Sequence, residues 1–212
     1  VYKRQLANRG GIVGGNAVKG GGVFVEDGGN FVLANAEIGM ENYPNSATLG
    51  GGVYVGVNAE FIITGGSVGY NTAEKGGGVY IDGGSFTMEC HKNGYVQHNS
   101  ATDGAGLYLN DGTVGEGING FISQNTATGN GGGVYIADGV YNMRSMLQNN
   151  KASNGAGIYV AGGSARQKYI IDTNTATGNG GGVYVAGGEF TAECRISENK
   201  ANSAAGIYVA DG

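Results

Sequence analysis

Three aspartates have the type and spacing that could serve metal chemistry in this chain of 212 residues. Asp82, Asp111 and Asp138 recur at intervals of 29 and 27 residues, and glycine follows each one. If these carboxylates lay one above another at the spacing of paired strands, they would repel, and a bound Ca²⁺ would relieve the repulsion. Asp-Gly is also common in turns, and it recurs at Asp27 and Asp211. The sequence therefore leaves a calcium site and a set of ordinary turns as the two interpretations.

Other catalytic arrangements find little support. Cys90-His91 with His98 suggests zinc, but adjacent residues of a strand face opposite ways and a fourth ligand is missing. The sequence contains no G-x-S-x-G, P-loop or H-E-x-x-H motif. Acid/base chemistry on polysaccharides needs two carboxyl groups close together, or a calcium cluster with a basic partner. Asp172 has no acidic counterpart at the same place in neighbouring repeats. We therefore expect a protein that is not an enzyme.

An internal repeat must position these residues. Glycine contributes 46 of the 212 residues, and no long glycine-free stretch has a helical period. In each repeat a glycine-rich block leads into an alternating triplet such as Val-Tyr-Val, which places the aromatic residue on one face of a strand and its neighbours on the other. The mean spacing is about 26 residues. The eight blocks begin at Gly20, Gly50, Gly76, Gly104, Gly131, Gly155, Gly180 and Ala204.

Two further signals complete each repeat. One is an aromatic or apolar residue ten or eleven positions after the block begins, and the other is an asparagine before the next block. Three short apolar segments separated by Gly, Asn or Asp predict three short strands and three turns per repeat. Stacked repeats would enclose the aliphatic side chains in one continuous core. The apolar signal falls at Phe31, Phe61, Phe86, Val114, Tyr141, Ala165 (a departure) and Phe190.

The asparagines form a predicted column along the stack. An asparagine tolerates the left-handed backbone conformation of a turn, and its amide can both donate to and accept from an asparagine one repeat away. We expect these residues to lock the turns rather than to bind ligands. The column comprises Asn16, Asn45, Asn71, Asn99, Asn125, Asn150, Asn174 and Asn199.

The aromatic residues of the triplets form a second column. If the flanking Val and Ile residues point inward, these rings point outward and stack on one another. The glycine two positions before each ring would leave the ring faces partly open. Such a stripe is either a binding platform for sugar rings or a partner protein, or a stack that only stiffens the sheet. Its members are Phe24, Tyr54, Tyr80, Tyr108, Tyr135, Tyr159, Tyr184 and Tyr208.

These features resemble the right-handed parallel β-helix of the pectin-lyase-like superfamily over residues 6–212. More narrowly, Gly131-Gly132-Gly133-Val134 and Gly155-Ala156-Gly157-Ile158 are similar to the GGA[ILV] repeats of polymorphic outer membrane proteins and adhesin-like surface proteins. Ile122-Ser123-Gln124-Asn125 loosely resembles their FxxN repeat. We expect an all-β fold of about seven full coils, each with three short strands, and both ends truncated.

The resemblance implies a non-catalytic passenger segment at the cell surface or outside the cell, associated with the outer membrane in the parent protein. It would present a binding face to a glycan or a host protein. Because the superfamily is rich in carbohydrate-active members, a polysaccharide lyase or glycoside hydrolase is the alternative.

Charge and chain ends set further expectations. The net charge of −5 and the pI near 5.0 disfavour nucleic acid as a partner, and no apolar run is long enough for a transmembrane helix. Residues 1–5, Val-Tyr-Lys-Arg-Gln, resemble a sequencing-library scar, so we expect residues 6–212 to form one β-helix domain cut from a longer protein. We expect a monomer apart from association through the cut ends.

Thiol and charge positions give two last predictions. Cys90 and Cys194 lie at equivalent places four coils apart, roughly 19 Å, which is too far for a disulfide, so both should be free. A stripe of charges predicts the exposed ion pairs Glu116 with Arg144 and Lys168 with Glu193. The whole stripe is Glu89, Glu116, Arg144, Lys168 and Glu193.

Overall fold

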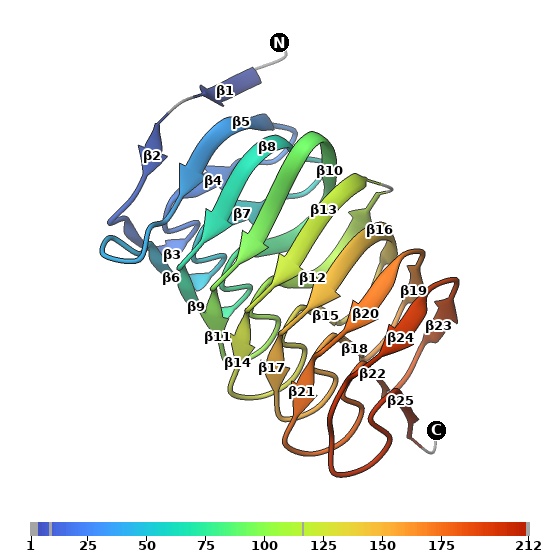
Figure 1. Cartoon of the computed structure of the whole chain (residues 1–212). Coiled ribbons are helices and arrows are strands. Elements are labelled where there is room, and N and C mark those ends of the chain that lie inside the picture. Colours follow the sequence, from blue (N-terminus) through green and yellow to red (C-terminus); the bar gives the residue numbers. More distant parts are fainter. Residues whose placement is uncertain (1–3, 9, 116, 211–212) are drawn as a thin grey trace.

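The chain winds into a right-handed parallel β-helix of about seven turns (Figure 1). It was analysed as a computed structural model that describes residues 4–8, 10–115 and 117–210, and only the backbone of residues 4–8, 90–93, 118 and 119. All pairings between the described strands are parallel, and these strands form one large sheet that wraps around the core and one smaller sheet. This confirms the fold expected from the repeat.

Each coil contributes one segment to each of three faces of the large sheet. The first face carries the aromatic triplets in β4 (Val23–Val25), β7 (Val53–Val55), the start of β10 (Val79–Gln97), the start of β12 (Leu107–Val114), β15 (Val134–Ile136), β18 (Ile158–Val160), β22 (Val183–Val185) and β25 (Ile207–Val209). The second face contains β1 (Arg4–Asn8), the start of β5 (Asn30–Ile38), the start of β8 (Glu60–Gly69), the middle of β10, the end of β12, the start of β16 (Val140–Gln148), β19 (Ser164–Gln167) and β23 (Glu189–Ala192).

The third face and the small sheet close each coil. The third face contains β2 (Gly11–Ile12), the ends of β5, β8, β10 and β16, and β13 (Ile118–Ser123), β20 (Ile170–Asp172) and β24 (Arg195–Ser197). The small sheet, a fourth segment that the sequence did not predict, contains β3 (Asn16–Lys19), β6 (Ser46–Leu49), β9 (Thr72–Lys75), β11 (Ser100–Ala101), β14 (Thr126–Ala127), β17 (Lys151–Ala152) and β21 (Thr175–Ala176).

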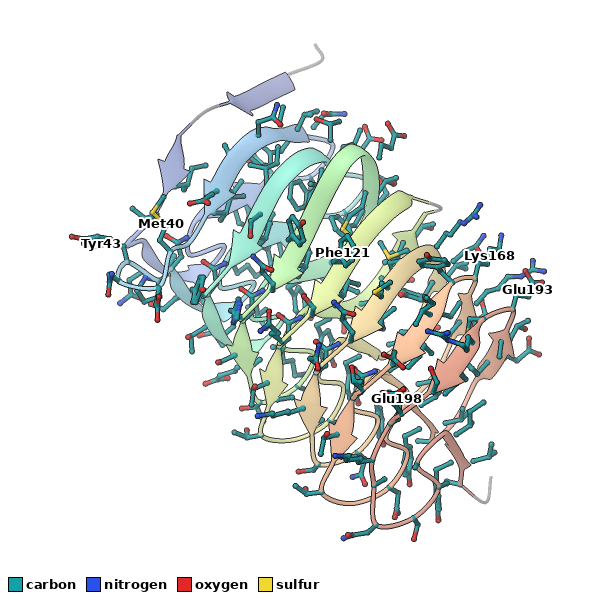
Figure 2. The ribbon with its side chains drawn as sticks, viewed as in Figure 1. Met40, Tyr43, Phe121, Lys168, Glu193 and Glu198 are labelled. Atoms are coloured by element: carbon teal, nitrogen blue, oxygen red, sulfur yellow. The ribbon has the colours of Figure 1, made fainter. Side chains whose placement is uncertain are left out.

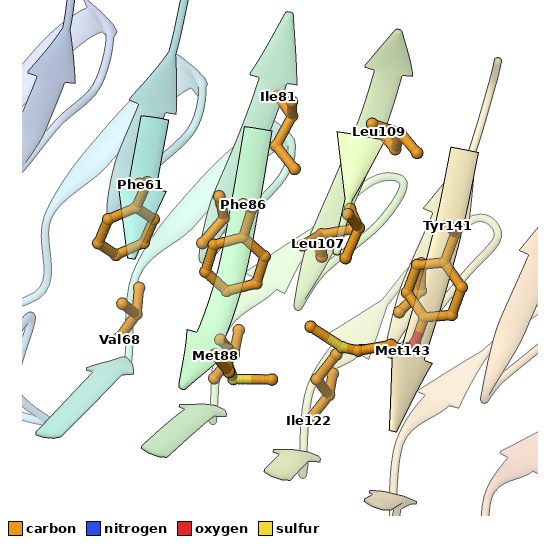
Figure 3. Close-up of a cluster of buried hydrophobic side chains, with 14 of the residues drawn as sticks. Phe61, Val68, Ile81, Phe86, Met88, Leu107, Leu109, Ile122, Tyr141 and Met143 are labelled. Atoms are coloured by element: carbon orange, nitrogen blue, oxygen red, sulfur yellow. Dashed lines mark hydrogen bonds between the residues drawn. The ribbon is translucent and has the colours of Figure 1, made fainter. Parts of the chain in front are cut away.

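The core is built from residues at equivalent places in successive coils. The apolar signal of the second face is confirmed, because Phe31 aligns with Phe61 and the register continues coil by coil to Phe190. Phe61, Phe86 and Tyr141 are fully buried, and Figure 3 shows Phe61 and Phe86 on neighbouring strands and Tyr141 two coils further on, among other core side chains. The aliphatic residue three positions before the asparagine is also fully buried from Val68 to Ile171, for example at Ile122. Stacking therefore encloses the apolar residues that one repeat could not bury alone.

The glycine two positions before each tyrosine faces the interior. A Cβ added at Gly133 would lie 2.6 Å from the carbonyl oxygen of Gly157 and 3.0 Å from Nδ2 of Asn150. No real Cβ fits so close to backbone. The expectation that this glycine opens the faces of the tyrosine rings was therefore wrong: glycine is required there because the next coil and the asparagine amides occupy the space.

From Asn71 to Asn199, the left-handed turn residue is the one before each asparagine, not the asparagine itself. The backbone φ is +61° at Tyr70, +55° at His98, +57° at Gln124 and +54° at Thr173. Asn149 and Glu198 occupy the same place, with φ of +56° and +53°. The prediction that the asparagine itself adopts the left-handed conformation was therefore wrong. The side chain of the asparagine points inward, and the residue before it makes the turn.

Several smaller predictions have mixed outcomes. Cys194 is a free thiol, as expected, whereas the side chain of Cys90 lies outside the described residues. Glu193 pairs with Arg166 of the preceding coil, a partner that the sequence did not predict. The predicted partner of Arg144, Glu116, is outside the described part of the chain. Strand β1 begins inside the segment set aside as a scar and pairs with β5.

Candidate binding surface

Hydrogen bonds between the buried asparagines of successive coils form a ladder, which holds the columns of surface residues in place. From Asn45 to Asn174, each Nδ2 donates to Oδ1 of the asparagine in the next coil at 2.9 to 3.0 Å, and Asn199 is the last acceptor. The same Nδ2 donates its other hydrogen to a backbone carbonyl, as from Asn125 to Val96 at 3.0 Å. The amides are therefore satisfied although Asn45 to Asn174 are buried. The structural role predicted for Asn45, Asn71, Asn99, Asn125, Asn150, Asn174 and Asn199 is confirmed.

Asn16 does not belong to this ladder. It aligns with Ser46, and the ladder position in the first coil is taken by Gly15, whose N–H donates to Oδ1 of Asn45 at 2.9 Å. The sequence placed Asn16 in the column because it precedes the first glycine block, but the register of β3 with β6 shifts it by one residue.

The aromatic rings of the first face stack without interruption from Phe24 to Tyr208. Their centroids are 4.7 to 5.6 Å apart and their planes lie within 4° to 19° of one another. Each ring between Phe24 and Tyr208 has a neighbour on each face, so a molecule that approaches the middle of the stack meets ring edges and hydroxyls. The predicted stacking is confirmed, but a platform that offers ring faces to sugars is not what the column presents.

Exposure divides the tyrosines of the column into a covered and an open half, and Phe24 at the start of the column is 51% exposed. Tyr54, Tyr80 and Tyr108 are buried at 3 to 5% exposure, which corrects the expectation of an open row. The ammonium groups of Lys19 and Lys75 lie 4.4 Å and 5.1 Å from ring centroids in this half, and Leu49 also packs against it. Tyr135, Tyr159, Tyr184 and Tyr208 are partly exposed.

A second ladder explains the open half. In the first three coils this position, directly before the glycine block, is occupied by the long side chains of Lys19, Leu49 and Lys75. In the later coils it is occupied by shorter polar side chains, which are Asp103, Asn130, Asn154, Asn179 and Ser203. Oδ1 of Asp103 accepts from the backbone N–H of Asn130 at 2.7 Å, and Nδ2 of Asn154 donates to Oδ1 of Asn130 at 3.0 Å. These residues were missed in the sequence, although each stands directly before the glycine block.

The three aspartates do not form a metal site. Asp82 accepts hydrogen bonds from the hydroxyl of Tyr54 and from Asn110, and Lys19 lies 4.0 Å away. Asp111 and Asp138 each accept from the backbone N–H of the following glycine at 2.6 and 2.7 Å. Among the described residues no three acidic, histidine or cysteine side chains gather in a group that could hold a metal ion. The calcium hypothesis was wrong: Asp82 and Asp111 are partners in the register of β10 with β12, but Tyr54 and Asn110 bind the first carboxylate and the turn N–H of Gly112 binds the second.

The environment of the tyrosine stack disfavours the phenolate form. Burial raises the pKa of Tyr135 to about 12, and its stacked neighbours Tyr108 and Tyr159 add to the shift. Burial also raises the pKa of Tyr54, where the hydrogen bond to Asp82 and its charge contribute. At neutral pH Tyr135 and Tyr159 therefore present neutral hydroxyls.

An open groove lies across the last three coils on another side of the molecule. Its volume is about 620 Å³, and its charged lining residues are Lys151, Glu198 and Lys200. Asn149 and Thr173, two of the left-handed turn residues, line it as well. The same column begins with Tyr70 and His98, whose rings stack at 4.7 Å. The groove is polar and combines one carboxylate with two ammonium groups.

Comparison with known proteins does not indicate what this surface binds. No family model matches the chain, and neither the curated proteins nor the solved structures give a significant match. In the part of the chain that the structure describes, no helix is long and apolar enough to cross a membrane.

Proposed function

We propose that this chain is a rigid, non-catalytic segment of a cell-surface, adhesin-like protein, related to the pectin-lyase-like β-helices, that binds glycan along the open half of the tyrosine column. The observation that carries this proposal is the partly exposed row of Tyr135, Tyr159, Tyr184 and Tyr208 beside the amides of the second ladder. A location outside the cell is part of the same proposal.

The ladder geometry suits a polyhydroxylated ligand. Tyrosine hydroxyls and asparagine amides both donate and accept hydrogen bonds, so they pair with sugar hydroxyls in either direction. The stack repeats every 4.7 to 5.0 Å in this half, which offers an extended chain a series of equivalent contacts. Each contact is weak, and affinity arises from several engaged together. The buried asparagine ladder and the partly exposed second ladder keep the row straight and so lower the entropy cost of binding.

Replacing hydroxyls while keeping the rings tests this proposal. The triple variant Tyr135→Phe, Tyr159→Phe, Tyr184→Phe preserves the stack and removes three polar contacts, so retention on a panel of immobilised plant and animal glycans should fall about tenfold or more. Tyr80→Phe, in the covered half, is the matched control and should bind as the parent does. Equal retention of parent and triple variant, or no retention of the parent on any glycan, would contradict glycan binding; capture of a host protein that the triple variant loses would instead favour a protein ligand.

The open groove is where we test the alternative of a carbohydrate-active enzyme, and it holds one carboxylate rather than the two that acid/base chemistry on polysaccharides uses. There Glu198 could act as acid or base beside Lys151 and Lys200. Under our proposal, incubation with pectin-like and other polysaccharides yields no new reducing ends and no unsaturated products. Product formation that Glu198→Gln abolishes would replace binding with catalysis.

A further inference from the structure

The third face carries an outward column that the sequence pattern did not reveal. Its strands lie in register, so residues from successive coils stand side by side across the sheet. The middle of the column is apolar and partly exposed, whereas the next residue along each strand is fully buried in the core. In chain order the column is Glu37, Ser67, Tyr95, Phe121, Met146, Ile170 and Arg195.

The apolar part is continuous. Tyr95 and Phe121 stack with ring centroids 5.3 Å apart, and Met146 and Ile170 follow in register. Figure 2 shows Phe121 on the broad face formed by β8, β10, β13 and β16. Four neighbouring apolar side chains that face away from the core of a parallel sheet form a patch of the kind that marks an interaction site.

Charges at the ends of the column indicate the partner. Glu37 lies three coils before Phe121 and Arg195 lies three coils after it, and both are exposed. A rotation of 180° about an axis that runs along the strands at Phe121 reverses the order of the coils. It therefore brings Glu37 of one copy opposite Arg195 of the other at both ends.

We propose that the third face packs against the same face of a second copy of this chain, around a two-fold axis at Phe121. In this arrangement Phe121 meets Phe121, Tyr95 meets Met146, and Ser67 meets Ile170. Glu37 and Arg195 form two symmetric ion pairs at the rim. The contact is isologous, so it closes as a dimer and leaves no free interface. This proposal departs from the monomer expected from the sequence and is independent of glycan binding.

The size of the face predicts a weak dimer. Six strand spacings give a length of about 29 Å, and two outward columns give a width of about 15 Å. Each copy would then bury roughly 450 Å², below the roughly 800 Å² of a standard stable interface. We therefore expect dissociation in the micromolar range, with the ion pairs setting the orientation more than the affinity.

Sedimentation velocity between about 1 and 200 μM tests the dimer. The parent chain should shift from monomer to dimer with concentration, and Phe121→Asp should weaken association by about tenfold or more because it sets two carboxylates face to face in an apolar contact. Val57→Asp is the matched control, since Val57 is exposed outside this face and the change in charge is the same. Circular dichroism and the melting temperature check that both variants remain folded.

Charge reversal tests the two-fold arrangement itself. Glu37→Arg and Arg195→Glu should each weaken the dimer by roughly 3- to 10-fold, because like charges then face each other, and the double variant should restore parental affinity. A chain that stays monomeric over the whole range overturns the proposal. So does association that Phe121→Asp leaves intact, which would point to stacking of copies end to end, or a double variant that is no better than the single ones.

Discussion

At the scale of single residues, each side-chain amide within the asparagine ladder takes part in several hydrogen bonds at once. Oδ1 of Asn125 accepts from both the backbone N–H and Nδ2 of Asn99, each at 3.0 Å. Its Nδ2 donates to Oδ1 of Asn150 at 3.0 Å. All three residues are buried, so water cannot replace a missing partner.

Asn125→Ala should therefore destabilise the chain strongly. It leaves two buried donors of Asn99 without an acceptor, and we expect a loss of about 3 to 5 kcal/mol in the free energy of unfolding, measured by urea denaturation. Asn202→Ala is the comparison, because Asn202 is exposed and donates a single hydrogen bond to the carbonyl of Thr177. A loss at Asn125 no larger than at Asn202 would show that the ladder contributes little.

Thr173 gives a prediction of the opposite sign. It is β-branched yet adopts a left-handed backbone, with φ of +54°, whereas Asn149 occupies the same place one coil earlier with a side chain that tolerates this conformation. Thr173→Asn should stabilise the chain by about 0.5 to 1 kcal/mol, and the reciprocal Asn149→Thr should destabilise it by a similar amount. Thermal melts of the two variants check this; shifts of the same sign would contradict a backbone origin.

At the scale of elements, strand β15 carries Tyr135, and through this residue the stability of the folded chain should depend on pH in the alkaline range. The pKa of Tyr135 is raised from 10.0 to about 12, mainly by burial. Between these values the folded chain keeps a proton that the unfolded chain has released. Stability therefore falls as pH rises through this window, and below pH 10 the phenol contributes no pH dependence.

Tyr135→Phe should reduce this fall. The variant lacks the ionisable group but keeps the ring, so its urea midpoint should decline less than that of the parent between about pH 10 and pH 12. Tyr108 and Tyr159 remain in both proteins, so the difference between the two curves reports Tyr135 together with its coupling to these two rings. Identical curves would mean that Tyr135 ionises equally easily in the folded and unfolded chains.

At the scale of the whole molecule, the fold could be predicted because each column repeats one chemical requirement in every coil. Asparagine and inward glycine recur because no other side chains satisfy the ladder and the close approach at Gly133. The left-handed turn residue could not be predicted, because residues as different as Tyr70 and Glu198 fill it. Only the backbone conformation is repeated there, and the residue type is free.

The candidate surface was predictable only in outline. The position of the tyrosine column follows from the triplets, but its division into a covered and an open half depends on the single residue before each glycine block, Lys75 in one half and Asn154 in the other. The misplaced calcium site has a similar origin. Asp82 and Asp111 do stand opposite each other, but the hydrogen-bond donors that reach each carboxylate, Tyr54 for one and the N–H of Gly112 for the other, have no sequence signal.

The ladder also gives the solenoid an electrical direction. Every Nδ2 from Asn45 to Asn174 points to the coil that follows, so the side-chain amide dipoles lie head to tail along the axis. Aligned amides polarise one another and their dipoles add, as peptide units do in an α-helix. The interior of this all-β protein thus carries a polarity of the helical kind, with its positive pole towards Asn199.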